Sequence, residues 1–246
     1  MSAPFQTAVV TGAGRGFGRA IAVALIAKGA RVVGIARDEQ ALNAVRDTLG
    51  ENFTPLAADA TDETLAQDVI RAHRPGLLVL NAGITPHIAP VHEQTWETFS
   101  RNWHTDTRHA FTWIRAALRE PLAPGSVVVA MSSGAALAGS PLSGGYASAK
   151  AAVRYIRGYA ADEADRAGLG IRFVTLLPQL TPATGLGAAG VAGYAARQGV
   201  DAETFVKGLQ PILTPDQVGE AVVQVAADPD SAAEYQLSGT GMRPIG

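Results

Sequence analysis

The sequence predicts an α/β fold in which a doubly wound parallel sheet of about seven strands is covered by helices on both faces. Strand and helix patterns alternate along all 246 residues. The strands read as continuous apolar runs, which is typical of strands buried on both faces. A glycine-rich turn joins the first strand to the first helix, as is common in such sheets. We therefore expect one domain over residues 1–246.

The first half of the chain alternates regularly between the two patterns. Gly29 is expected to end the first helix, because glycine readily adopts the left-handed conformation found there. Thr61 is the expected N-cap of the third helix. The predicted strands are 7–10, 31–36, 53–58 and 77–80, and the predicted helices are 19–28, 38–49 and 61–72.

The second half contains longer helices and one irregular segment. Segment 178–213 is rich in Gly, Ala and Pro and has weak periodicity. It is too long for a plain connection, so we interpret it as a mobile lid, a reading compatible with a partly helical surface insertion. The predicted helices are 96–118, 145–167 and 215–227, and the predicted strands are 126–131, 171–177 and 234–237.

Composition excludes several classes of function. The net charge of −2 gives no reason to expect nucleic acid or an anionic membrane as a partner. The absence of cysteine excludes disulfides, zinc–thiolate sites and cysteine nucleophiles, and the five histidines form no spacing typical of a metal site, so no metal is expected. No signal sequence or apolar run near 18 residues is found, so we expect a cytoplasmic protein.

The glycine-rich turn is the first motif that indicates chemistry. It runs from Thr11 to Gly18, with a spacing TG-x-x-x-G-x-G that differs from the common G-x-G-x-x-G. Glycines allow a close backbone approach to a pyrophosphate, and the following helix offers free N–H groups and positive potential. A turn that serves backbone geometry alone is the alternative.

Tyr146 and Lys150 form the second motif. A spacing of four places both side chains on one face of a helix. An ammonium beside a phenol favours the phenolate, so it should lower the tyrosine pKa from its reference of about 10. Such a phenol can give or take a proton when a carbonyl is reduced or formed. By itself the pair also fits an ordinary helix surface.

Four motifs in order resemble the short-chain dehydrogenase/reductase family of standard length, over nearly the whole chain. They are the glycine-rich turn, Asn81-Ala82-Gly83, Ser133 and Tyr146-x-x-x-Lys150. The resemblance implies a Rossmann-type fold, a nicotinamide cofactor and an oxidoreductase acting on a small molecule. It also implies a homo-oligomer, either a tetramer or a dimer. Trp96, Trp103 and Trp113 recur at helical intervals, which favours core or subunit contacts.

The resemblance assigns roles at the reaction centre. Ser133 would hydrogen-bond the substrate oxygen, Tyr146 would deliver the proton, and Lys150 would bind the nicotinamide ribose and tune the tyrosine. These roles suit the chemistry, because hydride arriving at carbon builds negative charge on oxygen. The neighbouring Ser132 should point the other way, and the thirteen-residue spacing to Tyr146 selects Ser133.

Two arginines favour NADP(H) over NAD(H). Arg37 follows the second strand where NADP-using relatives often carry a basic residue, and the NAD-type acidic residue is replaced by Ala36. Arg15 lies where a second basic residue often holds the 2′-phosphate, which a planar guanidinium suits. A plain surface role is the alternative for both, and Asp38 is an alternative ribose contact.

The resemblance implies further cofactor contacts. Asp59 matches the position that contacts adenine, and Asn81 and Gly83 line the floor of the site in relatives. The full expected set is Gly12, Gly14, Arg15, Gly16, Phe17, Gly18, Arg37, Asp59, Ala60, Asn81, Ala82, Gly83, Tyr146, Lys150, Pro178 and Thr181.

The chain departs from the family pattern twice. Asp106 stands where relatives usually have an asparagine that anchors a water linked to the lysine. A carboxylate accepts hydrogen bonds but cannot donate them, and Asn102, a turn away, is a poor substitute. Pro178-Gln179 replaces the usual Pro-Gly, and either Thr181 or Thr184 is left to bond the carboxamide.

The sequence therefore predicts an NADP(H)-dependent carbonyl reductase or alcohol dehydrogenase with Ser133, Tyr146, Lys150 and Asp106 in its catalytic centre. The alternatives are an impaired cofactor-binding regulatory or scaffold protein, and a reductase of C=N or enoyl C=C bonds. Substrate choice is expected to depend on residues after Gly83, on 134–144 and on 178–213.

Overall fold

The computed structural model describes residues 6–245 and has the predicted doubly wound architecture. Its sheet has the order β3-β2-β1-β4-β5-β6-β7-β8, in which the first seven strands are parallel. The strands are β1 Thr7–Thr11, β2 Arg31–Ala36, β3 Phe53–Ala57, β4 Leu77–Leu80, β5 Val127–Met131, β6 Arg172–Pro178, β7 Glu234–Ser238 and β8 Gly241–Pro244. The prediction of about seven strands missed β8, which pairs antiparallel with β7 through a tight hairpin.

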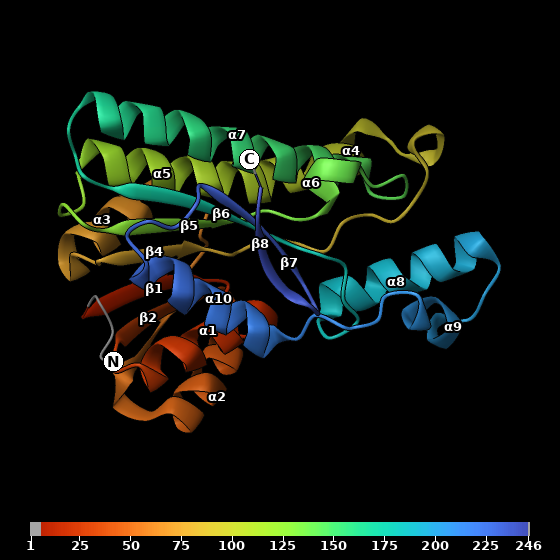
Figure 1. Cartoon of the computed structure of the whole chain (residues 1–246), viewed down its shortest axis with the longest axis horizontal. Helices are drawn as coiled ribbons and strands as arrows, with labels where there is room; N and C mark the ends of the chain where they lie inside the picture. The colour runs from red at the N-terminus through yellow and green to blue at the C-terminus, as the bar shows by residue number, and fades with distance from the viewer. Residues whose placement is uncertain (1–5, 246) are drawn as a thin grey trace.

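Helices cover both faces of the sheet (Figure 1). One apolar core lies between the sheet and α1, α2 and α10, and the other between the sheet and α3, α5 and α7. The helices are α1 Gly16–Ala27, α2 Glu39–Leu49, α3 Glu63–His73, α4 Trp96–Asn102, α5 Arg108–Arg119, α6 Ala135–Ala138, α7 Gly144–Arg166, α8 Gly185–Gln198, α9 Ala202–Lys207 and α10 Pro215–Ala227, with short 3₁₀ turns η1 Gly50–Asn52 and η2 Val91–Glu93.

Two local predictions are corrected by the structure, and segment 178–213 is partly helical, as one of its two readings expected. The predicted helix 96–118 is divided into α4 and α5 by a π-helical turn, η3 Trp103–Thr107. Asp62, not Thr61, is the N-cap of α3, since its carboxylate accepts from the backbone N–H groups of Thr64 and Leu65. Segment 178–213 contains two helices, α8 and α9, which extend from one end of the molecule (Figure 1).

The three tryptophans differ in how far they are buried. Trp113 is fully buried against it, whereas Trp96 and Trp103 are 76% and 41% exposed, so only one of the three belongs to the core. In the described part of the chain, the helices are too short or too polar to cross a membrane.

Candidate active site

The glycine-rich turn lies at the carboxyl edge of the sheet and is held by backbone contacts. Gly12 and Ala13 donate their N–H groups to the Ile35 carbonyl at 2.7 and 3.2 Å. A side chain at Gly18 would clash with the Gly12 carbonyl, and Gly16 has a φ of 53°, so both positions require glycine. The turn leads directly into α1. This cradle fits the pyrophosphate of a dinucleotide, as the sequence predicts.

Asn81 fixes the turn against β4. Its Nδ2 donates to the Thr11 carbonyl at 3.0 Å, and its N–H donates to Thr11 Oγ1 at 2.9 Å. Ala82 N–H donates to the same hydroxyl at 3.1 Å. The Asn-Ala-Gly motif therefore shapes the cofactor cradle from below, which is consistent with its predicted place on the floor of the site.

The residues expected around the adenosine end lie beside one another. Arg15 and Arg37 are both exposed, and both follow carboxyl ends of neighbouring strands. The Asp38 carboxylate caps α2 by accepting from Ala41 N–H at 2.9 Å, so it is already engaged. Asp59 accepts hydrogen bonds from the backbone N–H and the hydroxyl of Thr61. The bond from the backbone N–H is the largest cause that lowers the pKa of Asp59, and the Thr61 hydroxyl and the charge of Arg37 add to it. Together they outweigh partial burial, which raises the pKa.

Other residues of the expected set have structural roles that the spacing alone did not reveal. The Ala60 carbonyl accepts from Trp113 Nε1 at 2.8 Å, and Phe17 packs against the apolar core. A methyl group added at Gly14 would lie 3.2 Å from the Ala41 side chain and 3.8 Å from that of Ala36. The glycine turn and the end of β2 therefore form one continuous surface.

Ser132 and Ser133 point in different directions, as predicted. Ser132 Oγ is buried and donates to the Lys150 carbonyl at 2.8 Å, which ties β5 to α7. Ser133 is half-buried, and its side chain lies close enough to the Tyr146 phenol to lower the pKa of that phenol. Ser133 and Tyr146 therefore present two hydroxyl groups at one point at the carboxyl end of β5.

The pKa of Tyr146 is raised above its ordinary value, which differs from the predicted net direction. Burial is the largest cause of the rise and Asp106 adds to it, while Lys150 and the hydrogen bond from Ser133 oppose it. The predicted lysine effect is thus present, and desolvation outweighs it. The phenol therefore holds its proton at neutral pH, which suits a group that donates a proton.

Lys150 is buried within a ring of acceptors. Its Nζ donates to the Met131 carbonyl at 3.1 Å, lies 3.3 Å from Asp106 Oδ2 and stands 5.7 Å from the centre of the Tyr146 ring. Burial works to lower the pKa of Lys150, but Asp106 and then Tyr146 outweigh it and raise the pKa. The ammonium is therefore maintained inside the protein.

Asp106 lies in the π-helical turn η3, and its side chain and that of Asn102 both bind the backbone of Ile84. Asp106 Oδ1 accepts from the Ile84 N–H at 3.1 Å, and Asn102 Nδ2 donates to the Ile84 carbonyl at 3.0 Å. Asp106 and Asn102 therefore bind the two backbone groups of Ile84, and the prediction that Asn102 is a poor substitute for the usual asparagine stays a prediction. Asp106 Oδ2 has no aligned hydrogen bond within the described chain, although Lys150 lies in ion-pair range.

Gly83 makes the contact between Asp106 and Ile84 possible, because a methyl group at Gly83 would come within 2.9 Å of Asp106 Oδ2.

One buried histidine near the reaction centre was not singled out in the sequence analysis. His109 is 1% exposed, and burial, followed by the charge of Lys150, lowers its pKa to about 3. It is therefore neutral at physiological pH and adds no charge to the site.

The two threonines after β6 make different contacts. Thr181 is buried and its hydroxyl donates to the Leu213 carbonyl at 2.6 Å. Thr184 caps α8, and its methyl group lies near Gly16 of the glycine turn. Pro178 accepts from Gly134 N–H at 2.9 Å, which joins the segment to the loop after Ser133. Thr184 thus lies beside the glycine turn, and the hydroxyl of Thr181 is engaged within the chain.

Comparison with known proteins identifies the family. The short chain dehydrogenase family model matches residues 6–192. An uncharacterized short-chain type dehydrogenase/reductase of Sinorhizobium fredii is 31% identical over 176 residues, covering 71% of this chain and 69% of the relative. The chain belongs to the short-chain dehydrogenase/reductase family. The description of the family model and the name of this relative both say dehydrogenase.

Two further similarities fit this family. A 3-oxoacyl-[acyl-carrier-protein] reductase of Escherichia coli is 44% identical over 85 residues, and the match spans about a third of either chain (32% and 35%). The crystal structure of a 3-ketoacyl-(acyl-carrier-protein) reductase from Brucella melitensis complexed with NADH superimposes with a TM-score of 0.79 at 23% identity, covering 95% of this chain and 97% of that chain. The latter shows a shared fold.

Residues 6–245 contain no group of three or more histidine and acidic side chains placed to hold a metal ion.

Proposed function

We propose that this protein is an NADP(H)-dependent reductase or dehydrogenase that interconverts a carbonyl and an alcohol of a small organic molecule. The observation that carries this proposal is the cluster of Ser133, Tyr146 and Lys150 at the carboxyl end of β5, beside the glycine-rich turn. When bound, the nicotinamide supplies the hydride. Side chains of the protein supply the proton and stabilise the charge that develops on the substrate oxygen.

Each residue of the cluster has a distinct proposed task. Ser133 and Tyr146 donate hydrogen bonds to the oxygen on which negative charge develops, and Tyr146 transfers its proton to it. Lys150 stabilises the phenolate that remains and offers its ammonium to the ribose. Asp106 holds Lys150 as an ammonium, because the carboxylate lies 3.3 Å from Nζ.

Substitution of Tyr146 tests the reaction. Tyr146→Phe should lower turnover at least about a thousandfold, since general acid catalysis is removed, and should leave NADPH binding intact. Carbonyl-dependent NADPH oxidation by the two proteins measures the effect, with Tyr155→Phe, an exposed position 60% accessible on the same helix, as the matched control. Near-normal turnover in Tyr146→Phe would contradict the proposal. Binding of NADPH without Tyr146-dependent turnover would favour a cofactor-binding regulatory protein.

NADP(H) preference is proposed from Arg15 and Arg37. Both guanidinium groups are exposed beside the end of β2, and the competing Asp38 carboxylate is engaged in capping α2. Arg37→Ala should weaken NADPH binding about tenfold to a hundredfold and NADH binding much less, because one charge-assisted contact to the 2′-phosphate is lost. Arg31→Ala, at the opposite end of the same strand, is the control. Equal losses for both cofactors would remove Arg37 from the 2′-phosphate.

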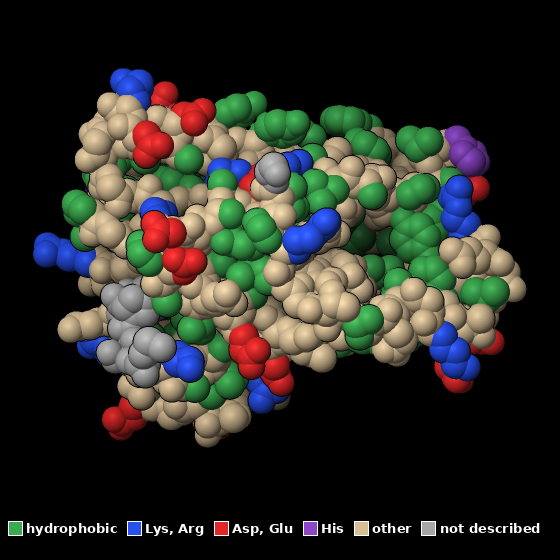
Figure 2. Space-filling view, viewed as in Figure 1, with side chains coloured by type: hydrophobic (Ala, Val, Ile, Leu, Met, Phe, Trp, Pro, Cys, Tyr) green, Lys and Arg blue, Asp and Glu red, His purple; other side chains and the backbone are tan. Residues whose placement is uncertain are grey.

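A homo-oligomer is proposed from an exposed apolar face on α4, α5 and α7. Figure 2 shows hydrophobic side chains along the edge formed by α7. The face includes large side chains that are each at least 41% exposed, namely Trp96, Trp103, Phe111, Tyr155 and Tyr159. Apolar patches of this kind mark protein interfaces. Light scattering tests the oligomeric state, and a monomer at micromolar concentration would contradict it.

A further inference from the structure

Three segments that surround Ser133 and Tyr146 are almost free of charge. Residues 132–149 and 173–196 contain no Lys, Arg, Asp, Glu or His, and residues 81–91 contain only His87. Charged residues make up 17% of the whole chain, so these segments differ from the rest of the protein. A surface with so few charged side chains is suited to contact with apolar groups.

These segments meet in space beneath α8. A methyl group added at Gly193 of α8 would lie 2.5 Å from Ile88 Cγ2 and 3.7 Å from Leu142 Cδ1. Ala89 N–H donates to the Leu142 carbonyl at 2.9 Å, which joins the loop after β4 to the loop before Tyr146. Helix α8 therefore packs over two apolar loops that lead directly to the reaction centre.

A tyrosine fastens α8 in this position. The Tyr194 hydroxyl is hydrogen-bonded to Ser140 Oγ at 2.5 Å, and it accepts from Leu142 N–H at 3.4 Å. Its ring stacks on Phe205 of α9, with centroids 6.3 Å apart. The polar atoms of this contact are therefore engaged with one another, and they offer no charge to a bound molecule.

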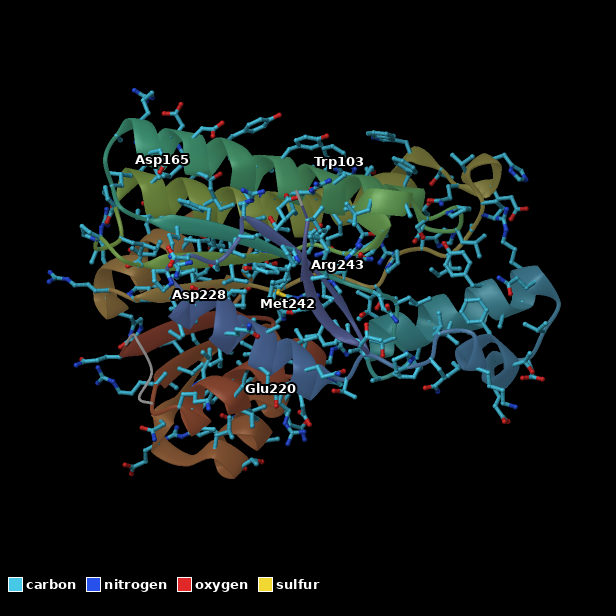
Figure 3. The ribbon with its side chains drawn as sticks, in the orientation of Figure 1. Trp103, Asp165, Glu220, Asp228, Met242 and Arg243 are labelled. Carbon is cyan, nitrogen blue, oxygen red and sulfur yellow. The ribbon has the colours of Figure 1, made fainter. Side chains whose placement is uncertain are left out.

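The surface beside α8 is hollowed, and hydrophobic side chains are visible inside the hollow and on its right side (Figure 2). Arg243 is seen nearer the centre of the sheet (Figure 3), on the edge strand β8, where its guanidinium donates to Gln236 Oε1 at 2.9 Å. The charged groups Glu203 and Lys207 of α9 are highly exposed and pair with each other at 3.0 Å. These groups have partners in the protein.

The cation of the reaction centre is also neutralised. Lys150 lies 3.3 Å from the Asp106 carboxylate, and both side chains are at least nine-tenths buried. An asparagine at this position would leave the site with a net positive charge, whereas the aspartate removes it. A carboxylate or phosphate on the substrate would therefore lose its hydration without gaining an opposite charge, which is costly.

We infer that the substrate is an uncharged, largely apolar carbonyl compound that binds beneath α8. This inference rests on the proposed carbonyl chemistry and names its substrate class. It separates this protein from enzymes that hold their substrates by a carboxylate or phosphate, because the three segments around Ser133 and Tyr146 contain no lysine or arginine for such a group.

Matched ketones test the inference. NADPH oxidation is measured with methyl 4-acetylbenzoate and 4-acetylbenzoate, and with two further ester and acid pairs of larger aryl ketones, so that only the charge changes. The ester should have a kcat/KM at least about thirtyfold higher than the acid, given the cost of an unpaired buried charge. Equal or better use of the acids, with turnover that requires Tyr146, would overturn the inference and leave the proposed function standing.

Two variants identify the source of the preference. Asp106→Asn removes the carboxylate that neutralises Lys150, so the ratio of ester to acid should fall about tenfold. Arg243→Ala is the control and should leave the ratio unchanged. Use of the acids that depends on Arg243 would overturn the inference. No Tyr146-dependent turnover of any of these ketones by protein that binds NADPH would contradict the proposed function, and the inference with it.

Discussion

Helix α7 carries two buried charge clusters that are built differently. At its first turns, Lys150 faces Asp106, whose Oδ2 has an ion-pair partner at 3.3 Å but no aligned hydrogen bond among the described residues. One to two turns later, Arg154 and Arg157 bind Glu234, with N–O distances of 2.6 to 2.7 Å, and Arg157 also donates to a threonine of β6. Both carboxylate oxygens of Glu234 therefore accept hydrogen bonds, whereas Asp106 Oδ2 accepts none from the described residues.

The difference indicates separate tasks along one helix. Glu234 joins α7 to β7, close to the antiparallel edge of the sheet, and its pairing with two arginines is a contact within the fold. Burial raises the pKa of Glu234, but the hydrogen bonds and charges of Arg154 and Arg157 outweigh it and lower the pKa below its usual value. The Lys150 cluster instead lies against the Tyr146 ring, where a cofactor and substrate are proposed to bind.

The largest effect is expected from Lys150. Lys150→Met should reduce turnover about a thousandfold, which corresponds to about 4 kcal/mol, because the ammonium that stabilises the phenolate is lost. It should also destabilise the fold, since Asp106 is left as an unpaired buried carboxylate. Combining it with Asp106→Asn should restore stability and leave turnover low. Stopped-flow turnover and urea unfolding of the three variants measure this; a double variant that recovers turnover would contradict the assignment.

A smaller effect, on stability alone, is expected from Glu234. Glu234→Gln should lower the free energy of unfolding by about 3 kcal/mol, because two partly buried arginines lose their carboxylate. Urea unfolding measures it, with Asp165→Asn, a charge removal on the same helix seen at its far end in Figure 3, as the control. A loss below about 0.5 kcal/mol would show that the cluster does not support the fold.

The pH dependence of this cluster has a definite sign. The pKa of Glu234 is depressed in the folded protein, so its stabilisation is complete above the unfolded pKa of about 4.3. It is lost as the pH falls through the lower, folded pKa. The difference in stability between the native chain and Glu234→Gln should therefore vanish in acid and persist at neutral pH.

The smallest effect is expected from Asp106→Asn. Asp106 raises the pKa of both Tyr146 and Lys150, so its neutral replacement should lower both. The pH profile of alcohol oxidation, which requires the phenolate, should shift to lower pH. Ser133 and Lys150 are the other groups that influence the phenol, and both remain. A profile that does not move would show that Asp106 acts only through the Ile84 contact.

The parts of the site that depend on local spacing could be predicted from the sequence. Tyr146 and Lys150 lie one turn apart on α7, and the glycine turn joins a strand to a helix, so both motifs are fixed within a few residues. The direction in which Ser132 and Ser133 point also follows from the alternation of a strand. The alternation of strands and helices along the chain follows from the apolar pattern.

Contacts between distant segments could not be predicted in this way. The π-helical turn that carries Asp106, and the Ile84 contact shared with Asn102, depend on how η3 packs against the loop after β4. Glu234 lies 77 residues from Arg157, and nothing near either residue indicates the pairing. The bounds of helices α8 and α9 could not be predicted, because the Gly and Ala content of this segment weakens the apolar periodicity.

The turnover number of folded Glu234→Gln tests most directly whether α7 separates chemistry from support. It is measured with saturating NADPH and ketone, at a temperature where circular dichroism shows that the variant is folded. We expect turnover within about twofold of the native chain, because Glu234 contacts none of the reacting groups. A loss approaching that of Lys150→Met would show that the two clusters act as one unit and would contradict it.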